Sequence, residues 1–254
     1  MAEHLRRELR VAREAALSRL AARMPGLAAD DWTALGGVPA VHWFIGRGRR
    51  LLGEGEKVTH LGILCKGWAL RQSRLDQERR QILGLFLPGD LVGLHVDGDN
   101  CATCEVEALT ACEVGEIDVV RLDAAAAGHP AIAKGLCQAR TRELARSEDD
   151  ILRLGRMTAY ERVCSFLLEI YRRQRELNPT RRSVDFPVSQ TLLADALGLS
   201  VVHVNRQIMQ LRREGAVTLD RRHLTVHDEH RLATIGGFHD RHFGMAGQVM
   251  QRAS

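Results

Sequence analysis

Residues 189–215 read SQTLLADALGLSVVHVNRQIMQLRREG, and this spacing predicts two short helices joined by a tight turn. Ser189 can cap the first helix, Gly198 can end it, and Ser200 can cap the second. Apolar residues recur at three- and four-residue intervals and define one buried face: Leu192, Leu193, Ala196, Leu197, Val204, Ile208 and Leu211. This is the pattern of a helix-turn-helix, a motif whose second helix enters the major groove of DNA.

The free face of the second helix carries side chains suited to reading base edges. Arginine can form two hydrogen bonds with guanine, and asparagine can do the same with adenine. We expect base contacts from Val201, Val202, His203, Asn205 and Arg206. Phosphate contacts, which position a protein without selecting sequence, are expected from Ser189, Gln190, Ser200, Arg212, Arg221 and Arg222.

A third element follows the two helices. Residues 216–227 (AVTLDRRHLTVH) alternate apolar and polar side chains on both sides of the polar turn Asp220-Arg-Arg, which predicts a two-stranded wing. An ordinary helical hairpin is the alternative to a DNA-binding unit. The agreement between spacing, caps and wing favours DNA binding.

Composition fits this interpretation. The chain has 254 residues, a formal net charge of +4 and 45% hydrophobic residues, which is enough for one large or two modest domains. No lysine or arginine occurs in residues 81–120, whereas ten arginines occur in residues 172–222, as a phosphate-binding surface requires.

No apolar run approaches bilayer length, and the charged N-terminus has no signal-peptide core. We therefore expect no membrane association, a cytoplasmic location and reduced cysteines.

Changes in the residue pattern along the chain predict five segments. Short apolar runs separated by glycines predict an all-β module with tight turns, and helical patterns flank it. The expected segments are an N-terminal helical extension (1–26), a β module (27–128), a long dimerisation helix (129–157), a winged helix-turn-helix domain (158–235) and a C-terminal tail (236–254).

The long helix carries a seven-residue repeat. Its first seam position holds Cys137, Leu144 and Ile151, and its second holds Arg140, Ser147 and Leu154. The repeat predicts a homodimer, with a helix packed only on its own β module as the alternative. A two-fold dimer would present two recognition helices one DNA turn apart and read a palindromic site. We expect a hinge near Gly155, where the long helix would be reoriented to switch DNA binding.

The order of β-roll, long helix and winged helix-turn-helix resembles the Crp/Fnr family of bacterial transcription regulators. The resemblance rests on residues 88–93 (PGDLVG), residues 110–117 (TACEVGEI), Pro130 and residues 190–211. It implies an α+β fold with an N-terminal jelly roll like that of cyclic-nucleotide-binding domains, a dimerisation helix and a C-terminal winged helix-turn-helix. It also implies a homodimer that binds double-stranded DNA at palindromic promoter sites and contacts RNA polymerase.

The effector position departs from the family pattern. Cyclic-nucleotide binders have a glutamate for the ribose, and an arginine followed by serine or threonine for the phosphate. In this family the effector binds in the stretch that corresponds to residues 93–110, called the cassette below. The residues at the ribose and phosphate positions are Leu94, Ala102 and Thr103. Ser147 and Glu148 of the dimer helix align with the residues that would contact the base. A buried phosphate would lack a cation unless Arg71 or Arg74 reached it from outside this stretch. We do not expect cAMP, and the effector stays unknown.

The second helix of the helix-turn-helix, the recognition helix, also departs from the family pattern. Arg206 matches the guanine-reading arginine of the family, but Val202 stands where many members have an acidic residue that reads cytosine. Valine can only contact a thymine methyl group or leave the base pair unread. The half-site should therefore differ from the familiar family sequences.

A Cys-x-x-Cys pair, Cys101 and Cys104, lies in the cassette with His95 nearby. Such a pair can hold zinc or iron or form a disulfide, so a metal or redox sensor is one alternative and structural cysteines are the other. Iron–sulfur members of the family have an N-terminal cysteine cluster, which is absent because the first cysteine is Cys65. Packing roles are expected for the remaining cysteines: Cys65, Cys112, Cys137 and Cys164.

Catalytic motifs are missing from the sequence. It contains no Walker phosphate loop, no Ser-His-Asp-like motif and no His-Glu-x-x-His, so we do not expect an enzyme. Two further alternatives remain: a DNA-binding protein without an effector, and an architectural protein without base preference.

Overall fold

The computed structural model describes residue 20 and residues 26–37, 40–76 and 79–237. The helical extension expected over residues 1–26 and the tail expected over residues 236–254 therefore lie almost entirely outside the described residues. The chain forms two compact units, Met1–Glu143 and Leu144–Ser254. The boundary between them falls inside a long helix.

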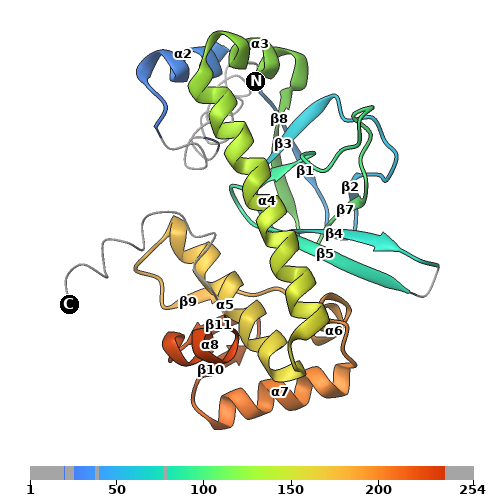
Figure 1. The fold of residues 1–254 in the computed structure, drawn as a ribbon, viewed down its shortest axis with the longest axis vertical. Helices are drawn as coiled ribbons and strands as arrows, with labels where there is room; N and C mark the ends of the chain where they lie inside the picture. The colour runs from blue at the N-terminus through green and yellow to red at the C-terminus, as the bar shows by residue number, and fades with distance from the viewer. Residues whose placement is uncertain (1–19, 21–25, 38–39, 77–78, 238–254) are drawn as a thin grey trace, which may run out of the picture. The chain divides into compact units, whose positions relative to one another are not determined.

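The first unit contains a β-roll made of two antiparallel four-stranded sheets (Figure 1). The strand order is β1-β8-β3-β6 in one sheet and β2-β7-β4-β5 in the other. The strands are β1 (Ala40–Ile45), β2 (Arg50–Leu52), β3 (His60–Lys66), β4 (Ala69–Arg74), β5 (Arg80–Phe86), β6 (Leu91–Val92), β7 (Glu105–Ala108) and β8 (Cys112–Asp118).

Two buried clusters hold this unit together, because successive strand residues face opposite sides of a sheet. One lies between the sheets and includes Leu64, Phe86, Val92, Val106 and Val114. The other joins the opposite face of β3 and β8 to helices and includes Leu35, Leu61, Ile63, Ile117, Leu122 and Ile132. The β-roll is therefore covered by helices on one side.

Helices α2 (Ala29–Gly37) and α3 (Val119–Gly128) lie within the segment expected to be all β. The Asp118 side chain caps α3 by accepting a hydrogen bond from the Arg121 backbone at 2.9 Å. Four alanines at residues 124–127 then favour the helix. The expectation of an all-β module is therefore wrong at both of its ends.

Helix α4 (Pro130–Arg156) begins at the proline, which the first turn of a helix tolerates, and runs for 27 residues. The second unit follows it with α5 (Ala159–Leu177), β9 (Ser183–Asp185), α6 (Gln190–Leu197), α7 (Val201–Arg213), β10 (Val217–Asp220), β11 (His223–Val226) and α8 (Glu229–Ile235). Strand β9 pairs with β11, so the predicted two-stranded wing belongs to a three-stranded sheet of order β10-β11-β9.

This α+β architecture of β-roll, long helix and winged helix-turn-helix confirms the predicted fold class. In the part of the chain that the structure describes, no helix is both long and apolar enough to span a bilayer.

Candidate nucleic-acid interface

Capping residues fix the two helices of the helix-turn-helix. The Ser189 hydroxyl accepts a hydrogen bond from the Leu192 backbone at 3.1 Å, and the Ser200 hydroxyl accepts one from the His203 backbone at 3.3 Å. Gly198 ends α6 with a φ of 60°, a left-handed conformation that glycine adopts without a steric cost. The predicted caps and turn are confirmed.

The buried face of this motif also follows the sequence pattern, with one exception. Its buried members are Leu192, Leu193, Leu197, Val204, Ile208 and Leu211. Ala194 is the buried alanine of α6, whereas Ala196, predicted for this role, is only half-buried. Ala194 stands beside Leu193 and three residues before Leu197, so it completes their ridge on the helix surface.

The opposite side of α7 is open to solvent. All five residues expected to contact bases are exposed, namely Val201, Val202, His203, Asn205 and Arg206. Val204 is fully buried among them, so packing fixes the rotation of the helix about its axis. No acidic residue occurs in α7. The face therefore presents hydrogen-bond donors, methyl groups and positive charge without a carboxylate to repel phosphate.

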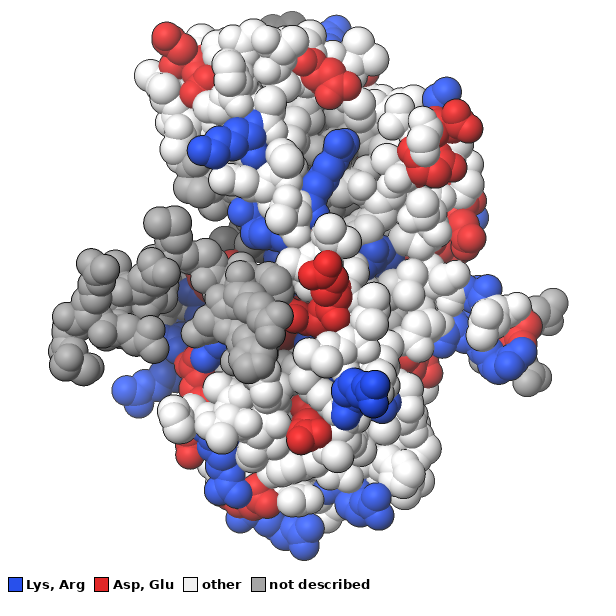
Figure 2. Space-filling view, in the orientation of Figure 1, with Lys and Arg blue, Asp and Glu red and all other residues white. Residues whose placement is uncertain are grey.

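The residues expected to contact phosphate lie at the start of α6, near the two ends of α7 and in the turn between β10 and β11. Ser189, Gln190, Ser200, Arg212, Arg221 and Arg222 are all exposed. Arg221 adopts a φ of 49° in the turn between β10 and β11, so the turn backbone itself places it at the tip of the wing. Arg212 donates from Nη2 to the Leu219 carbonyl, which ties α7 to the wing. In Figure 2, basic groups gather at the end of the view that Figure 1 assigns to α7.

Glu214, which sequence reasoning missed, holds the C-terminus of α7. Its carboxylate accepts hydrogen bonds from the Tyr160 hydroxyl, from Gln210 Nε2 at 3.0 Å and from Arg231 Nη2 at 2.7 Å. These bonds lower the pKa of Glu214, with Tyr160 contributing most. The bonds attach α7 to α5 and α8 and so fix its direction. Only the contact with Gln210, four residues earlier in α7, leaves a local signal in the sequence.

Arg162 is a second support that the sequence did not reveal. Its Nε donates to the Met157 carbonyl at 2.9 Å, and its Nη1 donates to the Leu197 carbonyl at 3.0 Å. It therefore joins the α4–α5 connection to the turn before Gly198. Its partners are backbone carbonyls, which no sequence pattern identifies.

Helix α4 carries exposed apolar side chains in the predicted seven-residue repeat. Leu144 is 61% exposed and Ile151 is 71% exposed, and Cys137 is exposed one repeat earlier. Each is followed four residues later by another exposed residue, namely Thr141, Glu148 and Gly155. These six residues, called the α4 seam below, form one continuous stripe on the helix.

The second position of this repeat is less open to solvent. Ser147 and Leu154 are half-buried rather than exposed. A β-carbon built on Gly198 would lie 3.6 Å from Leu154 Cδ2, so Leu154 packs towards the helix-turn-helix. Leu154 therefore contributes to the packing of the second unit, and its contact with a partner subunit stays a prediction.

The residues expected at the effector position occupy different settings. Leu94 packs against the helix-covered core, and Ala102 is 3% exposed. Thr103 is exposed, and its hydroxyl donates to the His95 carbonyl at 3.3 Å. Ser147 and the exposed Glu148 belong to the second unit. None of these five side chains carries positive charge.

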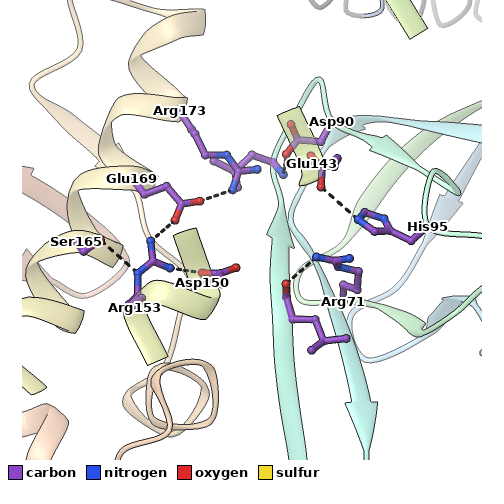
Figure 3. Close-up of polar contacts among 11 residues, drawn as sticks. Arg71, Asp90, His95, Glu143, Asp150, Arg153, Ser165, Glu169 and Arg173 are labelled. Atoms are coloured by element: carbon purple, nitrogen blue, oxygen red, sulfur yellow. Dashed lines mark hydrogen bonds and ion pairs between the residues drawn. The ribbon is translucent and has the colours of Figure 1, made fainter. Parts of the chain in front are cut away.

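A cation nevertheless lies inside the β-roll. Arg71 of β4 stands opposite Val106, which belongs to the core between the sheets, and is 9% exposed. Its Nη2 donates to the Leu83 carbonyl at 2.8 Å (Figure 3). His95, whose Nε2 lies 3.7 Å from Glu143 Oε2, is directed at α4 in the same view. Arg71 was a candidate cation from sequence, but its position inside the β-roll could not be predicted.

The Cys-x-x-Cys pair is not assembled into a metal site with three protein ligands. Cys104 is 2% exposed, and burial raises the pKa of its thiol against the opposing effect of Arg71. Cys101 is half-buried, and both cysteines are free thiols. Across residues 26–237, as far as the structure describes them, no three His, Cys, Asp or Glu side chains are grouped to hold a metal. Cys101, Cys104 and His95 are therefore not grouped as three ligands of one metal ion.

The remaining cysteines follow the packing expectation except for one. Cys65, Cys112 and Cys164 are buried, and Cys112 Sγ donates to the Trp68 carbonyl at 3.1 Å. Cys137 is exposed on the α4 seam, so its expected packing role inside the chain is corrected.

Part of each unit matches a known protein family. Residues 43–129 match the family model of the cyclic nucleotide-binding domain, and residues 161–235 match that of the Crp-like helix-turn-helix domain. The nitrogen fixation regulation protein FixK of Azorhizobium caulinodans is 31% identical over 201 residues, which cover 76% of this chain and 79% of the relative. The chain belongs to the Crp/Fnr family.

Other Crp/Fnr proteins agree with this assignment. The transcriptional activator protein FnrL of Cereibacter sphaeroides is 29% identical over 195 residues, covering 75% of this chain and 78% of the relative. The solved structure of FixK2 from Bradyrhizobium japonicum is 28% identical, with a TM-score of 0.71 over 78% of this chain and 98% of that chain. Crp/Fnr proteins are transcription regulators rather than enzymes, which agrees with the absence of catalytic motifs.

Proposed function

We propose that this protein is a sequence-specific transcription regulator that binds palindromic promoter DNA as a homodimer. The observation that carries the proposal is the exposed, acid-free face of α7, capped by Ser200 and fixed in direction by Glu214. A helix held in this way can enter a major groove with its first turn against the base edges. The exposed arginines of the wing and of α7 supply phosphate contacts.

Arg206 is the residue on which base preference should depend most. We expect Arg206→Ala to lose about 1–3 kcal/mol of discrimination at one base pair of each half-site. The measurement is the affinity for a site selected from random duplex DNA, and for single-base variants of that site. Arg222→Ala is the control, because loss of a phosphate contact should weaken binding to all sequences alike and reduce its salt dependence. Unchanged specificity in Arg206→Ala would refute this role.

The α4 seam supports the homodimer. Leu144 and Ile151 are large apolar side chains left open in one chain, and a second copy would bury both. In a parallel pair of helices, residues at the seam positions face their own symmetry mates. The same arrangement would bring the Cys137 side chains of the two protomers opposite each other.

Cys137 provides a direct check of this arrangement. We expect mild oxidation to cross-link the homodimer through Cys137, because seam geometry places the two thiols within disulfide reach. Non-reducing electrophoresis measures the cross-linked fraction, and Cys137→Ser should abolish it. Cys101→Ser is the control and should cross-link like the wild type. A wild-type homodimer that forms no cross-link, or one that forms to the same extent in Cys137→Ser, would contradict a parallel seam at this position.

The effector is proposed not to be a cyclic nucleotide. The cassette presents the apolar Leu94 and Ala102 where the family pattern requires a glutamate and an arginine, and Arg71 is engaged with the Leu83 carbonyl. A metal or redox signal at Cys101 and Cys104 stays an alternative, together with regulation without any effector. RNA polymerase is proposed as a further partner, and the cytoplasm as the location, because promoter DNA is there.

A further inference from the structure

Arg153 connects the end of α4 to α5 through buried contacts (Figure 3). Its Nη2 lies 2.8 Å from Glu169 Oε2, its Nε donates to Ser165 Oγ at 3.3 Å, and its Nη1 contacts Asp150. The guanidinium also lies 5.7 Å from the centroid of the Phe166 ring. One side chain of α4 therefore contacts three residues of α5.

Glu169 receives a second arginine from its own helix. Arg173 Nη1 lies 3.2 Å from Glu169 Oε1, so each carboxylate oxygen faces one guanidinium. The side chains of Arg153 and Arg173 are each 3% exposed. Burial alone would raise the pKa of Glu169, but the two arginines outweigh it and hold this pKa below its ordinary value. Because desolvation offsets much of the attraction in a buried ion pair, the main consequence of this network is a fixed arrangement.

The backbone between the two helices is short and held at both ends. Only Met157 and Thr158 separate α4 from α5. Arg162 binds the Met157 carbonyl, and Thr158 forms a reciprocal capping box with Glu161. Residues 144–156 of α4 belong to the same compact unit as the helix-turn-helix. The last turns of α4 and the recognition helix α7 are therefore parts of one body.

We propose that Arg153 is a positioning residue for DNA recognition: by locking α4 onto α5, it sets the spacing between half-sites that the dimer accepts. This inference rests on the proposed function, in which α4 forms the dimer axis. Any bend between α4 and α5 would move each α7 relative to its symmetry mate. The Arg153 contacts oppose that bend on the side of α4 that faces α5.

DNA geometry makes the spacing measurable. One added base pair turns one half-site by about 34° relative to the other, because B-DNA has about 10–10.5 base pairs per turn. A locked dimer cannot follow this rotation with both recognition helices. A dimer with a loosened α4–α5 junction can follow it.

The experiment compares affinities for three duplexes: a palindrome selected by the wild-type protein, the same palindrome with one base pair added at its centre, and a single half-site. We expect the added base pair to weaken wild-type binding about 100-fold, because the loss of two-site engagement costs about 10²–10⁴-fold. In Arg153→Met, the two palindromes should differ by less than about tenfold, while base preference within the half-site stays unchanged. Arg156→Met, which removes an exposed charge three residues later, is the control and should retain the wild-type ratio.

Arg153→Lys is the second variant, and it should give a ratio between those of the wild type and Arg153→Met. Lysine keeps the charge but cannot form the forked contacts of arginine. A folded Arg153 variant with the full wild-type ratio would overturn the proposal and leave the proposed function intact. A variant that weakens binding to all three duplexes equally would also overturn it, since that is the effect of a purely structural residue. Wild-type protein that selects no palindrome would overturn the proposed function itself.

Discussion

Replacing Leu144 and Ile151 by aspartate should leave the protein monomeric and lower its affinity for a palindromic site by at least about 100-fold. Both side chains are more than half exposed in one chain, so the substitutions should not disturb its folding. Complete burial of a fully exposed leucine or isoleucine is worth about 1.5–3 kcal/mol, and a dimer would bury the exposed part of four such side chains. The aspartates would also place four like charges in one seam.

Sedimentation velocity measures the loss of dimer, and DNA affinity is measured in parallel. Val120→Asp is the matched control, because Val120 is 77% exposed on α3, outside the α4 seam. That variant should remain dimeric and bind DNA as the wild type does. If the double aspartate variant stayed dimeric, the dimer axis would have to lie elsewhere, and the spacing role of Arg153 would lose its basis.

Replacing Gly67 by alanine should destabilise the β-roll by about 2–6 kcal/mol, because backbone strain and overpacking each cost about 1–3 kcal/mol. Gly67 joins β3 to β4 with a φ of +84°, in the left-handed region. A β-carbon there would lie 2.2 Å from the Ala111 carbonyl oxygen and 2.9 Å from Cys112 Cα. Both contacts are with backbone, which cannot turn aside as a flexible side chain does.

Urea unfolding measured by tryptophan fluorescence tests this expectation, since Trp68 is buried directly after Gly67. Gly98→Ala is the control: a β-carbon on Gly98 would contact nothing within 4 Å, and its φ lies outside the left-handed region. It should change the free energy of unfolding by less than about 1 kcal/mol. Equal stability of the two variants would show that the β3–β4 turn can relax.

The features predicted correctly from sequence are those that local chemistry determines. Ser189, Gly198 and Ser200 mark helix ends through hydrogen bonds and dihedral angles within a few residues of themselves. The exposed stripe through Leu144 and Ile151 follows from helical periodicity alone. The winged helix-turn-helix and the start of α4 could therefore be read without tertiary information.

The features that were missed depend on contacts between distant segments. Leu154 matches the seam repeat, but the repeat does not reveal that its side chain also lies near Gly198. Arg71 meets the carbonyl of Leu83 only because β4 and β5 pair. Helix α3 was missed for a different reason. Its Asp118 cap and its alanine run are present in the sequence, but the glycine-rich pattern around them favoured strands. Three-residue β9 is too short for any periodicity to appear.

The position of the unit boundary within α4 has a consequence for exchanging sensor modules between related regulators. A junction placed in the loop at Met157 would separate Glu169 and Arg173 from Arg153 and leave the Glu169 carboxylate with one of these two arginines. A junction between Glu143 and Leu144 would transplant the final thirteen residues of α4 together with the domain that they contact. Chimeras should therefore be joined in the middle of the helix, where the two halves can be spliced in phase as one continuous turn.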